Sequence, residues 1–189
     1  MAESKNILYA GLVISQLLTL AAYVVVTAGA AMLQKRANNL PLWKGLTDEQ
    51  LKATIPVYND VFQSTGYIIP YPQNPEYQFQ YQWWIIQFEL FVFLLTATCT
   101  VFPAIIPRLR PVALTFIAAA LVLVMDNVNA VFFLLRLDLA KTVYGATAIQ
   151  VAQAGLIMVG CANFLTIIFL GSYPAEQTTS YTSHKSDQV

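Results

Sequence analysis

The sequence predicts an all-α integral membrane protein, a bundle of four transmembrane helices with a long, partly helical outer loop between the first two. Two observations lead to this fold class. Of the 189 residues, 57% are hydrophobic and 11% are charged, whereas about a quarter of the residues of a soluble domain are charged. The apolar residues also gather in runs long enough to cross a hydrocarbon core of about 30 Å as helices.

Charge and cysteine content argue against several other classes. The ten basic residues balance the ten acidic ones, so the sequence predicts no positively charged surface that would attract nucleic acid. The single histidine, His184, lies in the tail, which makes a metal site improbable. No nucleophile with a histidine base, phosphate loop or cofactor motif is present, so we expect neither an enzyme nor a cofactor. Cys99 and Cys161 lie within apolar runs, where we expect them to pack as small hydrophobes.

The first predicted span covers residues 7–32 and is longer than the apolar segment of a signal peptide, so we expect an uncleaved anchor. The outer loop, residues 33–82, is too long for a structureless connection in a compact protein. Thr47 and Gln50 form a capping-box pattern that predicts a short helix, and Pro56 can open a second one. We interpret the loop as a lid over one membrane face, with a passive linker as the alternative.

The other three spans are predicted at residues 83–106, 112–137 and 147–170. Trp83 and Trp84 introduce the second span as an interfacial aromatic belt. The basic turn at residues 107–111 joins the second and third spans into an antiparallel hairpin. Because short loops rich in Lys and Arg stay in the cytosol, Arg108 and Arg110 predict that both chain termini are cytosolic.

These spans divide the chain into two parts. Residues 1–171 are expected to form the membrane domain, which has the lipid bilayer as its partner. Residues 172–189 are rich in Ser and Thr and have no apolar period, so we expect a disordered cytosolic tail.

Each predicted span carries polar residues at steps of three and four, which places them on one helix face. Lipid penalises such groups, so we expect these faces to point toward one another inside the bundle. The solute pathway predicted in this way consists of Gln16, Thr19, Thr96, Asp126, Asn129, Gln153 and Asn163. A structural interpretation stays open for the Gln and Thr residues, since such side chains often only join membrane helices, at about 0.6 kcal/mol each.

Asp126 is the leading functional candidate. An Asp at the centre of a bilayer costs about 2.5 to 3.5 kcal/mol of free energy, which exceeds the stabilisation that one hydrogen bond between helices provides. Counting from the ends of the predicted span puts Asp126 near the midplane. Glu89 and Arg136 lie further out and are predicted to form an ion pair at the outer mouth. While ionised, a midplane carboxylate opposes an anion, and the path lacks cationic rings, so the pattern favours a small neutral or proton-linked solute.

The four spans, the long aromatic-rich loop, the segment 125–136 and the short Ser/Thr tail resemble the low-carbon-dioxide-inducible plasma-membrane protein family of green algae. The resemblance covers the whole chain and carries over no site residue. It implies a plasma-membrane channel for carbon dioxide in inorganic-carbon uptake, assembled as a homotrimer of four-helix protomers.

Three alternatives remain. One is bicarbonate transport, and another is an accessory subunit held to a transporter by its polar faces. The third is a tetraspan organiser that binds partners through its outer loop, faintly indicated by residues 42–46. The loop lacks the cysteines that staple such organisers, which weakens the third alternative.

Overall fold

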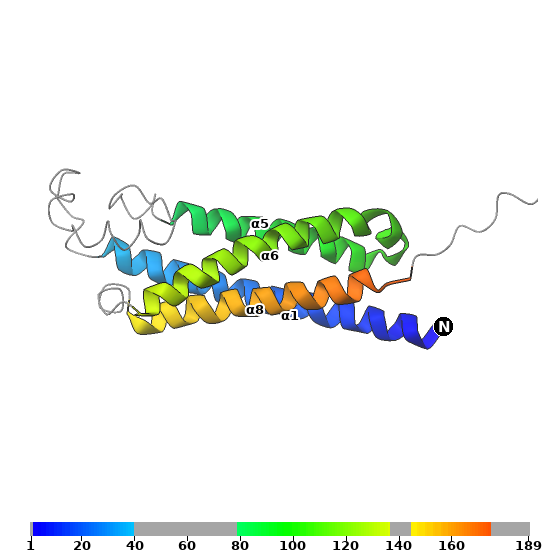
Figure 1. The fold of residues 1–189 in the computed structure, drawn as a ribbon, viewed down its shortest axis with the longest axis horizontal. Helices are drawn as coiled ribbons and strands as arrows, with labels where there is room; N and C mark the ends of the chain where they lie inside the picture. The colour runs from blue at the N-terminus through cyan, green and yellow to red at the C-terminus, as the bar shows by residue number, and fades with distance from the viewer. Residues whose placement is uncertain (1, 40–78, 137–144, 175–189) are drawn as a thin grey trace, which may run out of the picture.

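The computed structural model describes residues 2–39, 79–136 and 145–174. Their helices are α1 (Ala2–Asn38), α5 (Gln80–Val101), the 3-10 helix η2 (Pro103–Ile105), α6 (Ile106–Arg136) and α8 (Ala146–Gly171) (Figure 1). The four α-helices are all long and apolar enough to cross a membrane, which confirms the predicted fold class. The helices predicted near Thr47 and Pro56, and most of the predicted tail, lie outside the described residues.

The four long helices lie along one axis, and the chain direction alternates from each helix to the next (Figure 1). We call the two ends of the bundle the Asn38 end and the N-terminal end. The Asn38 end holds the last turn of α1 and the first turn of α5. The N-terminal end holds the start of α1 and the last turn of α8. Helices α1 and α8 lie side by side, as the blue and orange ribbons show.

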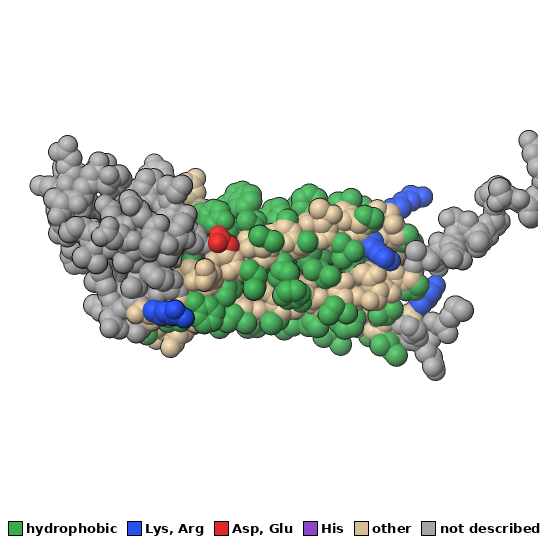
Figure 2. All heavy atoms as spheres, in the orientation of Figure 1, with side chains coloured by type: hydrophobic (Ala, Val, Ile, Leu, Met, Phe, Trp, Pro, Cys, Tyr) green, Lys and Arg blue, Asp and Glu red, His purple; other side chains and the backbone are tan. Residues whose placement is uncertain are grey.

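On the face shown in Figure 2, apolar side chains cover the middle of the bundle, and the Lys and Arg side chains lie toward its two ends. Large apolar side chains are exposed on all four helices, as expected for a surface that faces acyl chains. Examples are Leu17 (64% exposed), Leu94 (55%), Val122 (69%) and Phe164 (50%). This distribution of charge and apolar surface is that of a multi-pass membrane protein.

Small residues bring the backbones of α1 and α8 into direct contact. A Cβ atom added at Gly29 would lie 2.5 Å from Cα of Ala152. One added at Gly155 would lie 2.5 Å from the backbone nitrogen of Val26. Glycine is therefore required at both positions for this spacing, and the pair of helices packs through small residues as membrane helices commonly do.

The hairpin between α5 and α6 turns earlier than predicted. Helix α5 ends at Val101, and Pro103 opens η2, so the second span ends before residue 106. The predicted turn at residues 107–111 is instead the beginning of α6. Pro107 is tolerated there because the backbone N–H groups of a first helical turn have no partner within the helix. Because the second span ends earlier than predicted, the membrane depths that were predicted for its residues change as well.

Candidate functional site

A group of buried polar side chains from three helices lies within the bundle, and we call it the polar core. Its members are Ser15, Gln16 and Thr19 of α1, Glu89, Thr96 and Thr100 of α5, and Asn163 and Thr166 of α8. Each of them is at most 8% exposed. Among the buried residues that the structure describes, Glu89 is the only charged one.

Hydroxyl groups join α1 to its neighbours in the polar core. Thr96 Oγ1 donates to Gln16 Oε1 at 3.1 Å, which links α5 to α1. Thr166 Oγ1 and Ser15 Oγ lie 3.2 Å apart and link α8 to α1. Thr19 Oγ1 donates to the Ser15 carbonyl of its own helix at 2.8 Å. Because each hydroxyl carries one proton and two acceptor lone pairs, these groups can exchange partners at little cost.

Glu89 and Asn163 form the link between α5 and α8. Asn163 Nδ2 lies 3.1 Å from Glu89 Oε1 and 3.3 Å from Oε2. The predicted ion pair of Glu89 with Arg136 is not formed, because Glu89 is 3% exposed inside the bundle while Arg136 is exposed in the last turn of α6. The prediction was wrong because a span starting at Trp83 put Glu89 in its outer part, whereas α5 runs from Gln80 to Val101 and has Glu89 near its middle.

The amide of Gln16 has unused hydrogen-bonding capacity. Its Nε2 is buried and has no partner among the described residues. Rotating the amide by 180° would direct Nε2 at Thr96 and leave Oε1 without a partner instead. A buried polar atom without a partner costs about 1 to 3 kcal/mol. In either orientation the polar core therefore retains one group able to bond a small polar molecule.

The prediction that Asp126 and Asn129 face the bundle interior is wrong, since both are exposed on α6. Asp126 lies close to the Tyr81 side chain of α5. Tyr81 lies in the first turn of α5, so Asp126 lies toward the Asn38 end rather than at the midplane. The buried residues on the inward face of α6 are apolar, for example Ile117 and Val124, with Asn127 as the exception. Close packing of the apolar residues against neighbouring helices, rather than the polar face with Asp126 and Asn129, decides which side of α6 points into the bundle.

The other predicted pathway residues divide clearly. Gln16, Thr19, Thr96 and Asn163 are brought together in the polar core. Gln153 is half-buried in the first part of α8, and none of the described hydrogen bonds links it to the core.

Ser15 and Thr166 were not among the predicted pathway residues. Helical spacing alone could have found both, because Thr166 follows Asn163 by three residues and Ser15 precedes Thr19 by four.

An apolar section separates the polar core from the Asn38 end, and we call it the dry segment. It consists of Ala22, Val26 and Ala30 of α1, Ile86 of α5, and Leu156 and Val159 of α8. These side chains are at most 7% exposed. Any solute that moves along the bundle axis between the Asn38 end and the polar core must pass them.

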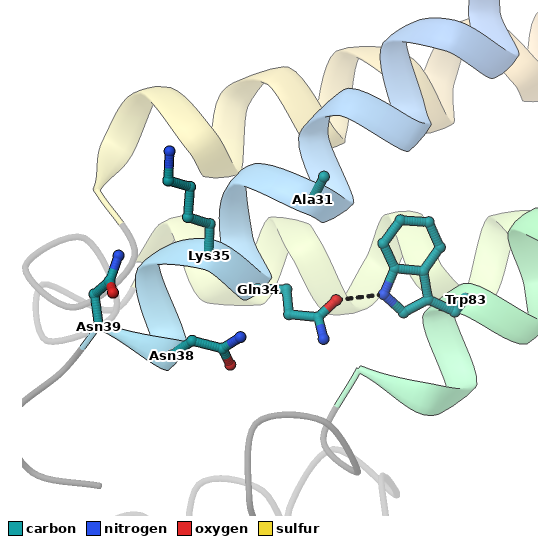
Figure 3. A pocket seen from close by; sticks show the side chains of 6 residues that line it. All are labelled: Ala31, Gln34, Lys35, Asn38, Asn39 and Trp83. Atoms are coloured by element: carbon teal, nitrogen blue, oxygen red, sulfur yellow. Dashed lines mark hydrogen bonds between the residues drawn. The ribbon is translucent and has the colours of Figure 1, made fainter. Parts of the chain in front are cut away.

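Beyond the dry segment, a recess of about 370 Å³ opens at the Asn38 end between α1 and α5 (Figure 3). Its lining consists of Ala31, Gln34, Lys35, Asn38, Asn39 and Trp83. Trp83 Nε1 donates to Gln34 Oε1 at 2.6 Å and ties the first turn of α5 to α1. The recess, the dry segment and the polar core thus follow one another along the bundle.

The solved structure of the Chlamydomonas reinhardtii LCI1 channel is similar to this chain over nearly its whole length. The two chains share 70% sequence identity with a TM-score of 0.82, and the match covers 90% of this chain and 99% of that one. The chain belongs to the LCI1 channel family. The resemblance drawn from the sequence is thereby confirmed. No protein-family model and no curated protein matches the chain. Membership of the LCI1 family makes the polar core, the dry segment and the recess candidate parts of a membrane channel.

Proposed function

We propose that the protein conducts carbon dioxide, a small neutral solute, through the interior of each four-helix bundle and so serves inorganic-carbon uptake. The observation that carries the proposal is the order of recess, dry segment and polar core along one bundle. Membership of a channel family supports conduction as the activity. The residues along the path favour a neutral solute.

The dry segment favours an uncharged solute. Moving an unpaired ion into apolar surroundings costs on the order of tens of kcal/mol in idealised estimates, and hydrophobic constrictions exclude ions for this reason. Bicarbonate would cross the dry segment without a buried Lys or Arg among the described residues to compensate its charge. Carbon dioxide has no net charge and meets no such barrier.

The polar core supplies weak, exchangeable contacts beyond the dry segment. Gln16 Nε2 can donate a hydrogen bond to an oxygen of carbon dioxide. Carbon dioxide has no donor group, so it needs no acceptor from the protein. The neighbouring hydroxyls of Thr96 and Ser15 already have partners on their own helices, so they can release a passing solute readily. Conduction requires binding that is favourable enough to admit the solute and weak enough to release it.

We also propose the setting in which this channel works. The resemblance to the algal family supports the plasma membrane and a homotrimer. The basic residues Arg108 and Arg110 at the beginning of α6 support cytosolic termini, with the Asn38 end outside. The tetraspan-organiser alternative depends on residues 40–78, which lie outside the described residues.

The test uses the full chain in sterol-rich vesicles that contain carbonic anhydrase and a pH dye. After rapid mixing with dissolved carbon dioxide, we expect protein-containing vesicles to acidify faster than empty ones. Gln16→Leu should lower the protein-dependent rate by about two- to tenfold, the equivalent of one hydrogen bond. Its thermal stability should be unchanged or raised, because the amide without a full set of partners is gone.

A parallel measurement without the enzyme follows uptake of labelled bicarbonate, which we expect to equal that of empty vesicles. Equal acidification of protein-containing and empty vesicles would contradict conduction of carbon dioxide. Protein-dependent bicarbonate uptake would replace the proposal with the bicarbonate alternative.

A further inference from the structure

One side of α5 carries two groups that accept hydrogen bonds, one before and one after the dry segment. Gln82, Ile86 and Glu89 follow one another at steps of four and three residues, so they share one face of the helix. Gln82 lies in the first turn of α5 at the Asn38 end, Ile86 belongs to the dry segment, and Glu89 belongs to the polar core. A solute on the proposed path therefore meets an acceptor on each side of the dry segment.

Both acceptors have unused capacity. Gln82 Oε1 is buried and has no partner among the described residues. Asn163 Nδ2 lies 3.1 and 3.3 Å from the two Glu89 oxygens, and no other donor reaches Glu89 in the part of the chain that the structure describes. An amide nitrogen has two hydrogens, whereas an ionised carboxylate offers about four lone-pair sites. About half of the Glu89 sites are therefore open to a further donor.

The Glu89–Asn163 pair lies at the inner edge of the dry segment. Ile86 of the dry segment precedes Glu89 by one turn of α5. Val159, also of the dry segment, precedes Asn163 by one turn of α8. Carbon dioxide cannot use the open lone pairs at this edge, because it has no hydrogen to donate. The edge instead favours a solute with N–H or O–H groups.

We propose that the same path also conducts ammonia, a small neutral molecule that carries three N–H groups. The inference rests on the interior path proposed above for carbon dioxide. The dry segment admits neutral ammonia but opposes the ammonium ion, because an ion finds no charged partner among the described residues of this segment. Beyond it, ammonia donates to Glu89 and regains part of the hydrogen bonding that it gave up to water. Gln82 Oε1 offers the same contact at the Asn38 end.

Sterol-rich vesicles that hold the full chain, carbonic anhydrase and a pH dye test the proposal. After rapid mixing with an ammonium salt, ammonia that enters the lumen binds a proton there and raises the luminal pH. We expect protein-containing vesicles to alkalinise faster than empty ones. The same vesicles are mixed with dissolved carbon dioxide, so each variant gives a ratio of the protein-dependent ammonia rate to the carbon dioxide rate.

Glu89→Leu combined with Asn163→Leu removes the acceptor together with its donor. Once thermal unfolding has confirmed that the double variant is folded, it should show a ratio lowered by about two- to tenfold, the equivalent of one hydrogen bond. Gln82→Leu, which leaves the polar core intact, should lower the ratio in the same direction. Gln87→Leu is the matched control, because Gln87 is an exposed amide residue of the same helix, and it should leave both rates as in wild type.

Carbon dioxide conduction without protein-dependent entry of ammonia would overturn this inference and leave the proposed function standing. Absence of both activities would contradict the interior path itself, and this inference with it. A wild-type ratio in both Gln82→Leu and the double variant would show that the two acceptors do not select the solute and would overturn the inference. Light scattering after an osmotic step measures water entry. Protein-dependent water entry without ammonia entry would assign the acceptors to water and would also overturn it.

Discussion

Glu89 and Asn163 place a carboxylate and its amide partner near the middle of a membrane bundle. Asn163 Nδ2 serves both carboxylate oxygens, at 3.1 and 3.3 Å, and Glu89 is 3% exposed. Such a pair is valuable chiefly because either partner alone would be costly to bury. The effects of the single substitutions should therefore not add up in the double variant.

Asn163→Leu should lower the free energy of unfolding by about 1 to 3 kcal/mol, because it leaves the Glu89 carboxylate buried without a partner. Glu89→Gln should stay close to wild type, since an amide oxygen can still accept from Asn163. Combining Asn163→Leu with Glu89→Leu should recover much of the loss. Thermal unfolding of the detergent-solubilised protein measures all three, and a double variant less stable than Asn163→Leu would contradict this account.

Residue spacing predicted part of the polar core correctly and Asp126 incorrectly, for one physical reason. Polar residues at steps of three and four do share a helix face, and the stripe through Thr115, Val122, Asp126 and Asn129 is one face of α6. The spacing does not reveal whether that face points inward. The small and apolar residues on the opposite face of α6, such as Ala113, Ile117 and Ala120, pack against the neighbouring helices and turn the stripe outward.

At the scale of elements, α1 and α8 are held together by backbone contact, whereas α5 meets both through side-chain hydrogen bonds. A Cβ atom at Gly155 would lie 2.5 Å from the backbone nitrogen of Val26. In contrast, Thr96 meets Gln16, and Glu89 meets Asn163, through polar side chains that can exchange partners. We infer that α1 and α8 form the rigid part of the bundle, while the seam along α5 can open for a solute.

Gly155→Ala should therefore push α1 and α8 apart and lower the free energy of unfolding by about 1 to 3 kcal/mol. Gly160→Ala is the matched control on the same helix, because its Cβ atom would lie 3.9 Å from Val124 Cγ1, an ordinary contact. Thermal unfolding compares the two variants. Equal stability of Gly155→Ala and Gly160→Ala would contradict the tight packing of α1 against α8.

The break between α5 and α6 lies earlier in the chain than the sequence predicted. Apolar composition located all four membrane-spanning helices, because a stretch that crosses a bilayer must be long and apolar. Composition did not locate the hairpin, since apolar residues continue past the break at Phe102 and Pro103. A proline disfavours the helical conformation of the residue before it, so Pro103 predicts that the helix ends before Phe102. A second span that ends there has Glu89 closer to its middle.

At the scale of the whole molecule, the bundle combines an apolar exterior with an interior divided into a dry and a polar section. The dry segment opposes ions, and the polar core offers exchangeable hydrogen bonds to a neutral solute. On the face shown in Figure 2, the charged side chains lie toward the two ends of the bundle. The central proposal is that a solute passes through the interior of the four-helix bundle rather than along its outer surface.

The most direct test of this claim fills the polar core without removing a bond between helices. Thr19 is 5% exposed, and its hydroxyl bonds the Ser15 carbonyl of its own helix. Thr27 makes the same kind of bond to the Tyr23 carbonyl but is only half-buried and lies outside the polar core. Thr19→Phe and Thr27→Phe therefore add the same bulk to one helix at two depths.

Both variants are compared with wild type in the carbon dioxide acidification assay, after thermal unfolding has confirmed that each is folded. Thr19→Phe should reduce acidification to the rate of empty vesicles, while Thr27→Phe should retain the wild-type rate. A folded Thr19→Phe that conducts as fast as wild type would contradict passage through the interior of the bundle.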